Sequence, residues 1–582
     1  MENPQIKELK ILENYKKESH VLVNQRFNKI KSQKFTSKYI EKLLNTPDFT
    51  ENLTQEDCDF LENLNALEVQ KMLKSDSKES LESIVNKYHF RKKQTKNEKK
   101  HLTWSFYAEP ISQAKQLDNQ VKELSLEETK KTLPLYGFVL SVKDSIYVKN
   151  SPSTSGLFIN LDRIASEDPE TITKLKNAGA VITSKGNIPQ LLFSMESNNN
   201  IFGDCLNPFD SSRTSGGSSG GDCALIASGM VNAALGSDGA GSLRIPALFC
   251  GIDAFKPSPH RLSIQCHASF FSRGYGSEAF PQKYFAKGDE QFIALKNIGP
   301  LARTAKELSC MLKVMYENQS FDNSIVPMPW EEDRPFVRRI GVIREFDFLE
   351  PCSASKRALE ETVQKLKKEG YEVVEITGIQ ELLQEIIFWS IVTFQKNECL
   401  FNCISGVNPF GEALLPLYKL AKTLHSSPSF LLRFLRWREG DSRKGMFFDT
   451  FFESKKINQM SLQLKISDFY LQLEAKMTEL NVSSLLTIGL PTPAIRLFDS
   501  NVCQSMCAYL FIFNALNMPA GVCSVSFVRE HEQVYESKHQ DYITEKLKEV
   551  MEGSKGLPVG VQVVARAYHD EVVLKIMEDI EA

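Results

Sequence analysis

The sequence predicts an α/β fold, in which strands and helices alternate along the chain. A β-rich run, YGFVLSV at residues 136–142, is followed by a helical pattern at residues 168–182 that ends at Gly179 and leads into a short strand. A second unit at residues 338–378 has the pattern strand, long helix, strand. The run LPVGVQVVA at residues 557–565 is typical of another buried strand.

The first hundred residues differ from the rest. They are polar and rich in Lys and Glu, with helical spacing of apolar residues near the start, and they end in the basic run RKKQTKNEKK at residues 91–100. This pattern predicts an N-terminal helical arm and a basic linker over residues 1–100, followed by the main domain over residues 101–582. The basic run could contact anionic lipid or a partner, but a solvated connector is the interpretation that the composition favours.

Composition excludes several classes of protein. Of the 582 residues 42% are hydrophobic and 25% are charged, which is typical of a globular protein with a sizeable core. The net charge of −3 provides no basic field for a nucleic acid. The twelve cysteines form no CxxC pair or Cys/His cluster, so we expect reduced, mostly buried thiols and no metal. The first twenty residues lack the apolar stretch of a secretory signal, so we expect a cytoplasmic protein.

The segment at residues 214–258 is the most unusual in the chain. Residues 216–220 satisfy GxSxG, but that elbow needs a strand before its serine, and a polar turn precedes this one. A phosphate-binding loop would need GK[ST] after the glycines, which is missing. A flexible Gly/Ser linker would not continue into the small apolar helix that ALIASGMVNAAL predicts.

Taken together, the segment resembles the amidase signature family. It has a GGSSGG core at residues 216–221, a small apolar helix, an acidic residue, small residues and then Ser-Leu-Arg-Ile-Pro at residues 242–246. The resemblance implies that Ser242 is the nucleophile and that Ser218, 24 residues earlier, is a bridging serine. It also implies that Lys143, which lies in a Val-Lys-Asp sequence 75 residues before Ser218, is the base.

The chemistry of these residue types is consistent with that assignment. A serine hydroxyl is a poor nucleophile until a neighbouring base takes its proton, and the segment contains no histidine. A lysine can be that base only when it is neutral, and burial lowers the pKa of lysine by up to about 3–5 units. Strand alternation places Val139, Ser141 and Lys143 on one face of the first predicted strand.

The resemblance implies further residues that face the substrate. The backbone amides after Asp238 are the expected donors to the carbonyl oxygen, with Asp238 and Arg244 bracing their loop. The expected donors are Gly239, Ala240, Gly241 and Ser242. In the family, a backbone carbonyl two residues after an Asn-x-Pro-Gln/Glu sequence faces the substrate, which here is the carbonyl of Leu192.

Two positions depart from the family pattern. Ala240 stands where glycine is common, and its methyl group narrows the allowed backbone angles while the amide donor remains. We expect this change to affect rate or substrate size rather than reaction type. Ser237 stands where threonine is frequent, and since the hydroxyl is retained we expect it to be tolerated.

Several stretches resemble the fatty acid amide hydrolase branch of the family, among them PLYGFVLSVKDS, FCGI followed by KPSPHRLS, NALNMPAGV and KGLPVGVQVVA. Residues 408–440 contain two short amphipathic helical patterns, rich in Leu, Phe and Trp beside clustered Lys and Arg. Such a hairpin suits insertion into a membrane interface, at the place where this branch carries its membrane cap. The sequence lacks the amino-terminal transmembrane helix known in the branch, so we expect peripheral attachment to endomembranes.

The resemblance therefore implies a large mixed β-sheet surrounded by helices, a homodimer, and no metal or organic cofactor. The implied reaction is hydrolysis of a lipid amide, of the N-acylethanolamine or primary amide type, to a free fatty acid and an amine. Two alternatives remain. One is a glutamine-cleaving amidotransferase subunit, which leaves the apolar hairpin unexplained. The other is an inactive lipid-binding scaffold, which the intact Lys143, Ser218 and Ser242 disfavour.

Overall fold

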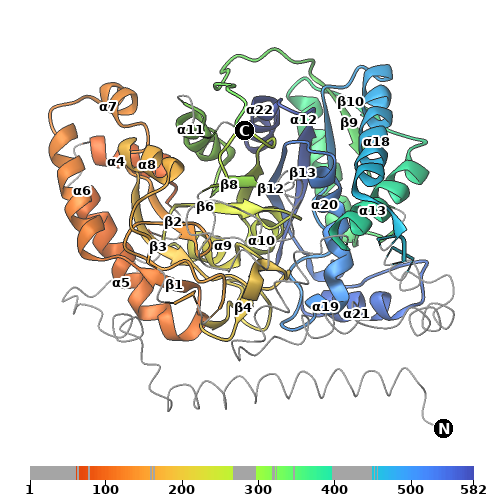
Figure 1. Cartoon of the computed structure of the whole chain (residues 1–582), viewed down its shortest axis with the longest axis horizontal. Coiled ribbons are helices and arrows are strands. Elements are labelled where there is room, and N and C mark those ends of the chain that lie inside the picture. The colour runs from red at the N-terminus through yellow and green to blue at the C-terminus, as the bar shows by residue number, and fades with distance from the viewer. Residues whose placement is uncertain are drawn as a thin grey trace, which may run out of the picture.

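The computed structural model describes most of the chain after residue 60. The described residues are 61, 64–75, 79–157, 160–161, 164–265, 297–317, 322, 324–344, 346, 348–395, 449–450, 452–454 and 456–582. Within them the chain builds an 11-stranded sheet in the order β1-β3-β2-β6-β8-β7-β12-β13-β11-β9-β10, and β4 and β5 form a separate two-stranded sheet. Figure 1 shows α5 and α6 beside the β1–β3 edge and α13 and α18 towards the β9–β10 edge.

Strand bounds follow the apolar runs of the sequence. The strands are β1 (Leu102–Ser105), β2 (Val139–Lys143), β3 (Val181–Gly186), β4 (Asn198–Asn199), β5 (Gly203–Asp204), β6 (Ala233–Asp238), β7 (Asp253–Lys256), β8 (Asn297–Ala302), β9 (Arg339–Ile343), β10 (Glu372–Glu375), β11 (Ser484–Ile488), β12 (Ala520–Phe527) and β13 (Pro558–Ala565). The sheet is mixed: β2 is parallel to β3 and β6, and β9 is parallel to β10 and β11. The strands from β6 through β8, β7, β12 and β13 to β11 pair antiparallel, as β1 does with β3.

The helices occupy the connections. The α-helices are α4 (Ala66–Lys74), α5 (Leu81–Lys99), α6 (Ala108–Val121), α7 (Leu126–Thr132), α8 (Glu170–Asn177), α9 (Gly220–Ala227), α10 (Arg244–Cys250), α11 (Ala305–Tyr316), α12 (Ser353–Lys368), α13 (Gln380–Gln395), α18 (Gln459–Glu479), α19 (Ser500–Cys503), α20 (Ala508–Ala515), α21 (Tyr542–Met551) and α22 (Asp570–Glu581). Both predicted strand–helix–strand units are confirmed, as β2-α8-β3 and β9-α12-β10. None of the helices in the described ranges is both long and apolar enough to cross a membrane.

The basic run differs from its predicted form. Residues 91–100 were expected to be a solvated connector, but α5 extends to Lys99, and both Arg91 and Lys92 are buried. The physical reason is the apolar face that Ile84, Val85 and Tyr88 form one turn earlier, which packs in a core cluster with residues of β2 and β3. Lys92 is drawn in with that face, and its Nζ donates to Thr183 Oγ1 at 2.5 Å. The first 60 residues of the predicted arm lie outside the described residues.

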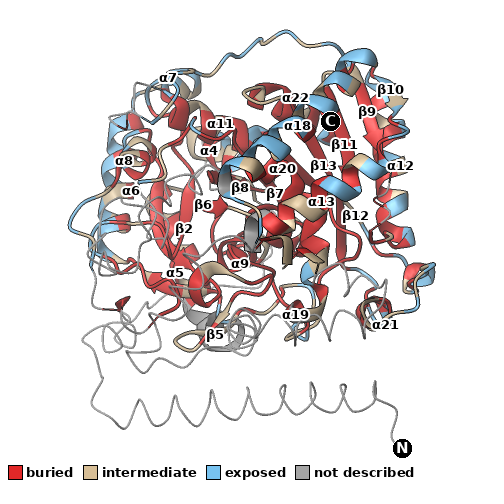
Figure 2. Cartoon of the chain, turned by 45° about the vertical axis from the view of Figure 1, so that its right-hand side comes forward, coloured by how far each residue is buried: buried red, intermediate tan, exposed pale blue. Residues whose placement is uncertain are grey.

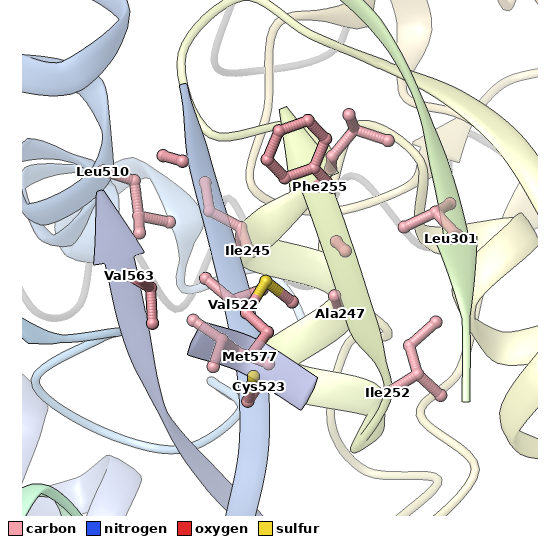
Figure 3. Packing of buried hydrophobic residues seen from close by; sticks show 14 of the residues in the cluster. Ile245, Ala247, Ile252, Phe255, Leu301, Leu510, Val522, Cys523, Val563 and Met577 are labelled. Atoms are coloured by element: carbon pink, nitrogen blue, oxygen red, sulfur yellow. The ribbon is translucent and has the colours of Figure 1, made fainter. Parts of the chain in front are cut away.

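The centre of the sheet is buried on both faces. Figure 2 shows the central strands in the colour of buried residues, with exposed positions on the outward sides of α12 and α18. Figure 3 shows one part of this core, where Ile245 of α10, Val522 and Cys523 of β12 and Met577 of α22 gather in one apolar cluster. Helix α10 is therefore anchored in the core, and this fixes the loop that precedes it.

Candidate active site

The sheet brings the predicted base and the nucleophile loop to one edge. Lys143 is the last residue of β2, and the loop that carries Ser242 follows β6, the parallel neighbour of β2. Carboxyl ends of adjacent parallel strands meet at the same edge, where α/β proteins commonly bind their ligands. The topology thus places residues 143 and 239–242 together although about a hundred positions separate them in the chain.

Lys143 is fully buried among hydroxyl groups. Its Nζ donates to Ser218 Oγ at 2.7 Å, to Ser237 Oγ at 3.0 Å and to the carbonyl of Ser237 at 3.1 Å. Burial lowers the pKa of Lys143 from its ordinary value to about 7, and this loss of hydration outweighs the opposing charges of Asp222 and Asp238. A substantial fraction of the amine is therefore neutral near pH 7.

Ser218 lies in the turn that leads into α9, with 2% of its surface exposed. The peptide bond between Gly217 and Ser218 is cis. The next amide, that of Ser219, donates to the carbonyl of Ser242 at 3.1 Å. This hydrogen bond ties the turn that holds Ser218 directly to the loop that holds Ser242.

A buried ion pair shapes the loop before α10. Asp238 and Arg244 are both fully buried and their side chains meet at 2.9 Å. The two carboxylate oxygens of Asp238 also accept from the amides of Gly241 at 2.7 Å and Leu243 at 3.2 Å. Burial alone would raise the pKa of Asp238, but the Arg244 guanidinium holds it well below its ordinary value. The carboxylate is thus ionised and folds the loop around itself, with Ser242 between the two bonded amides.

Arg244 is held in turn by the C-terminal half of the chain. Its Nη1 donates to the carbonyl of Leu510 at 3.0 Å and to Gln562 Oε1 at 2.6 Å, and its Nη2 donates to Asn514 Oδ1. Asn514 also donates to Asp238 at 2.9 Å, which closes the network. Every polar group here has a partner, as a buried ion pair requires in order to be tolerated.

Comparison with known proteins identifies the family. A family model described as Amidase matches residues 83–574. The chain belongs to the amidase family. Fatty-acid amide hydrolase 1 of Sus scrofa is 29% identical over 461 residues, which cover 77% of this chain and 75% of the relative. Fatty acid amide hydrolase 1 of Caenorhabditis elegans is 27% identical over 519 residues, 85% of this chain and 84% of the relative.

A solved structure of a fatty acid amide hydrolase superposes with a TM-score of 0.68 at 20% identity, and it covers 96% of this chain and 94% of its own. The predicted fold, a large mixed sheet surrounded by helices, is confirmed by that superposition. The family match begins at residue 83, inside α5, in agreement with the packing of that helix in the core. The protein is an amidase, a hydrolase of carbon–nitrogen bonds in amides.

The predicted site residues of this amidase differ in how far they are exposed to solvent. Lys143 is fully buried, Ser218 is almost so, and Ser242, Ala240 and Leu192 are partly exposed. The predicted base and the predicted bridging serine are thus shielded from water, whereas the predicted nucleophile is accessible from the surface.

The amides after Asp238 fall into two groups. The amide of Gly241 is already donated to Asp238, so it is not available to a substrate oxygen as the sequence had suggested. Among the described residues, the amides of Gly239, Ala240 and Ser242 have no protein acceptor. Gly241 has another role: its φ of +101° is open to glycine but strained for other residues. Ala240 keeps φ outside the left-handed region, so its extra methyl group is accommodated without backbone strain.

Leu192 lies in an unusual backbone segment. Leu191 and Leu192 have φ values of +60° and +67°, which non-glycine residues rarely adopt. The turn is held by hydrogen bonds from the amide of Leu191 to the carbonyl of Ser155 at 2.9 Å and from the amide of Leu192 to the carbonyl of Pro189 at 3.1 Å. Strained backbone held in this way is common at ligand-binding sites.

Three residues of the site were not assigned a role from the sequence. Ser237 contacts Lys143 through both its hydroxyl and its carbonyl. Asp222, fully buried in α9, accepts from Ser141 Oγ at 2.6 Å and raises the pKa of Lys143 by its charge. Ser141 lies two residues before Lys143, so strand alternation, which places both on one face, could have pointed to it. Ser237 could have been found because it lies just before the signature loop on the same strand.

Replacing Asp238 by Asn tests the role of the buried ion pair. The amide keeps the shape of the carboxylate but leaves the Arg244 charge buried without a counter-ion, which costs about 3–5 kcal/mol of unfolding free energy. Urea denaturation of Asp238→Asn should show this loss. The matched control is Glu127→Gln, which removes the Lys130–Glu127 pair with a similar distance of 2.7 Å but side-chain exposures of 40% and 81%. Equal stability of the two variants would contradict the proposed importance of the pair.

Proposed function

We propose that this amidase hydrolyses fatty acid amides through an acyl-enzyme on Ser242, with Ser218 as proton relay and Lys143 as base. The observation that carries the assignment is the contact of 2.7 Å between Lys143 Nζ and Ser218 Oγ, in a fully buried setting that lowers the pKa of the amine to about 7. A charged lysine would have no lone pair to accept a proton, and burial supplies the neutral form.

The hydroxyl groups around the amine define the path of the proton. A neutral amine has two N–H donors and one lone pair. The two N–H groups match the carbonyl and Oγ of Ser237, and the lone pair can accept from the hydroxyl of Ser218. Ser218 is then free to accept the proton of Ser242, whose loop its neighbour Ser219 contacts.

The reaction follows in two halves. As the Ser242 oxygen bonds to the carbonyl carbon, its proton passes to Ser218, which hands its own proton to the neutral amine of Lys143. Lys143 returns a proton through Ser218 to the nitrogen as the C–N bond breaks. The amine leaves and the acyl group stays on Ser242. Water then attacks the ester and gives a proton to Lys143 through Ser218; the relay returns that proton to the Ser242 oxygen as the acyl bond breaks, which releases the fatty acid and restores the neutral amine. The amides of Gly239, Ala240 and Ser242 stabilise the developing oxyanion, and the carbonyl of Leu192 accepts from the substrate N–H.

A fatty acyl substrate is supported by two observations. Two relatives, which match across 77% and 85% of the chain, are named as fatty acid amide hydrolases. The apolar and basic pattern at residues 408–440, which lies outside the described residues, is typical of a helical hairpin that enters a membrane interface. A glutamine-cleaving subunit would have no use for such a hairpin. We therefore favour N-acylethanolamines or primary fatty amides as substrates.

Membrane contact and self-association are part of this proposal. The hairpin would hold the protein peripherally on the cytoplasmic face of endomembranes, where lipid amides partition. Helix α18 supports a homodimer, because Met460, Leu464 and Leu471 are 72%, 58% and 61% exposed and their spacing places them on one face of the helix. Packing against a second copy of the chain would remove that apolar face from water. Sedimentation equilibrium, which measures the mass of the particle in solution, tests whether the dimer forms.

Ser242→Ala should abolish both amide hydrolysis and covalent labelling by a lipid fluorophosphonate, because the attacking oxygen is gone. Ser218→Ala should retain Ser242 yet lose at least about a hundredfold in kcat, since general acid–base transfer contributes about 10²–10⁴ in rate. Ser263→Ala is the control, a serine that bonds to Asp322 at 2.6 Å and takes no part in the relay. Full labelling of Ser242→Ala would refute the assignment of the nucleophile.

The rate should fall at acidic pH because Lys143 must be neutral to act. Its pKa of about 7 means that the neutral fraction, and with it kcat/KM on a short soluble amide, drops about tenfold for each pH unit below 7. Lys143→Arg should be inactive at every pH, since a guanidinium stays protonated. A wild-type profile that stays flat from pH 5 to pH 8 would show that Lys143 is not the base.

Replacing Leu431, Phe434 and Trp437 together with Ser tests the membrane hairpin. The variant should lose binding to anionic liposomes and turn over long-chain amides more slowly, while hydrolysis of a short soluble amide is unchanged. If these side chains are instead part of a core, the three truncations should destabilise the protein by about 3–5 kcal/mol each and abolish both activities. Liposome sedimentation, thermal unfolding and both rates on one preparation separate the two outcomes.

A further inference from the structure

Three potential metal ligands meet at the far end of α10 from Ser242. Asp253 begins β7, Cys523 lies on β12 and Glu581 ends the C-terminal helix α22. One ligand atom from each, two carboxylate oxygens and the thiol sulfur, lies within 4.8 Å of the other two. The strand register explains the meeting, since Val522 pairs with Ala254 and the next pair along the ladder brings Cys523 beside Asp253.

The cluster leaves a buried carboxylate oxygen without a partner. Asp253 is 3% exposed, and its Oδ1 accepts from the amide of Ser524 at 3.2 Å. Its Oδ2 has no hydrogen-bond donor among the described residues. Two acids and a thiol in contact need either a shared proton or a cation.

The chemistry of the three groups favours a cation of the zinc class. A thiolate beside two carboxylates suits Zn²⁺, whereas Mg²⁺ and Ca²⁺ prefer oxygen ligands alone. Zinc bonds of about 2.0–2.3 Å place neighbouring ligand atoms of a tetrahedral site roughly 3.5 Å apart, and the three atoms here already lie within 4.8 Å of one another. Glu581 is exposed, so an ion can enter from solvent and keep a water molecule as its fourth ligand.

We propose that Asp253, Cys523 and Glu581 bind a zinc-class divalent cation that fastens the end of α22 to the sheet. The other end of this helix is already held, because Asp570 accepts from the amide of Ser258 at 2.8 Å and from its hydroxyl at 2.6 Å. At the cluster end, Glu581 Oε1 accepts from the amide of Ala305 at 2.7 Å, which holds this carboxylate beside the start of α11. The cation therefore adds a second anchor for α22, far from the amide-cleaving residues.

The test uses the full chain, freed of affinity tag and treated with a chelator. Titration with Zn²⁺ should show one bound equivalent by calorimetry and a rise in unfolding temperature that grows with zinc concentration. Co²⁺ should give a thiolate-to-metal charge-transfer band. Cys523→Ser should abolish that band, and Asp253→Asn and Glu581→Gln should each weaken zinc affinity at least about tenfold. Cys310→Ser, which removes a partly exposed thiol of α11 outside the cluster, should match the wild type.

Glu581→Gln tests the proposal even if the buried variants fail to fold, because Glu581 is exposed and is not among the proposed amide-cleaving residues. It should hydrolyse a short soluble amide at the wild-type rate while it loses zinc affinity. The proposal is wrong if the wild type binds no zinc and shows no charge-transfer band, and the cluster then holds a shared proton. It is also wrong if Glu581→Gln and Cys523→Ser bind zinc as tightly as the wild type, since the ion then lies elsewhere on the surface.

Discussion

The chemistry of this amidase depends on keeping one amine away from water. Lys143 is the last residue of a strand in the interior of the sheet and is fully buried. In place of water, its amine contacts the hydroxyls of Ser218 and Ser237 and the carbonyl of Ser237. Loss of hydration lowers its pKa, and the carboxylates of Asp222 and Asp238 oppose that change. The resulting balance near neutrality keeps part of the amine in the neutral form that the proposed mechanism needs, and this balance lasts only while the surrounding core excludes water.

The nucleophile loop depends on a second buried charge. Asp238 bonds the amides on either side of Ser242, and Arg244 holds Asp238 in its ionised form. The loop therefore has one conformation, set before any substrate arrives. Preorganised donors of this kind stabilise developing charge without rearrangement during the reaction, which is the main advantage a folded site has over water.

Much of this arrangement could be predicted from the sequence, for reasons that differ between residues. Strand alternation and apolar runs placed β2, β9 and β13, since period and length are local properties. The signature segment pointed to Ser218 and Ser242 because many consecutive residue types constrain it, and the Val-Lys-Asp sequence pointed to Lys143.

The rest depends on contacts that no local pattern contains. Gly241 was expected to donate to the substrate, but its amide direction is set by Asp238, three residues earlier in a folded loop. The basic run at residues 91–100 was predicted to be solvated because charged side chains are mostly exposed in proteins. In the structure, the apolar face one turn earlier in α5 packs in the core and places Lys92 there with it. The support of Arg244 by Asn514 and Gln562 joins residues about 270 and 318 positions apart, which only the completed sheet brings together.

That last contact has a consequence during biosynthesis. Gln562 lies on β13 and leaves the ribosome 318 positions after Arg244, and without it the Arg244 guanidinium lacks one of its acceptors. The proposed catalytic residues are all translated by position 242, but the acceptors that hold Arg244 arrive only with α20 and β13. The loop before α10 is therefore braced late in synthesis, when β13 joins the sheet.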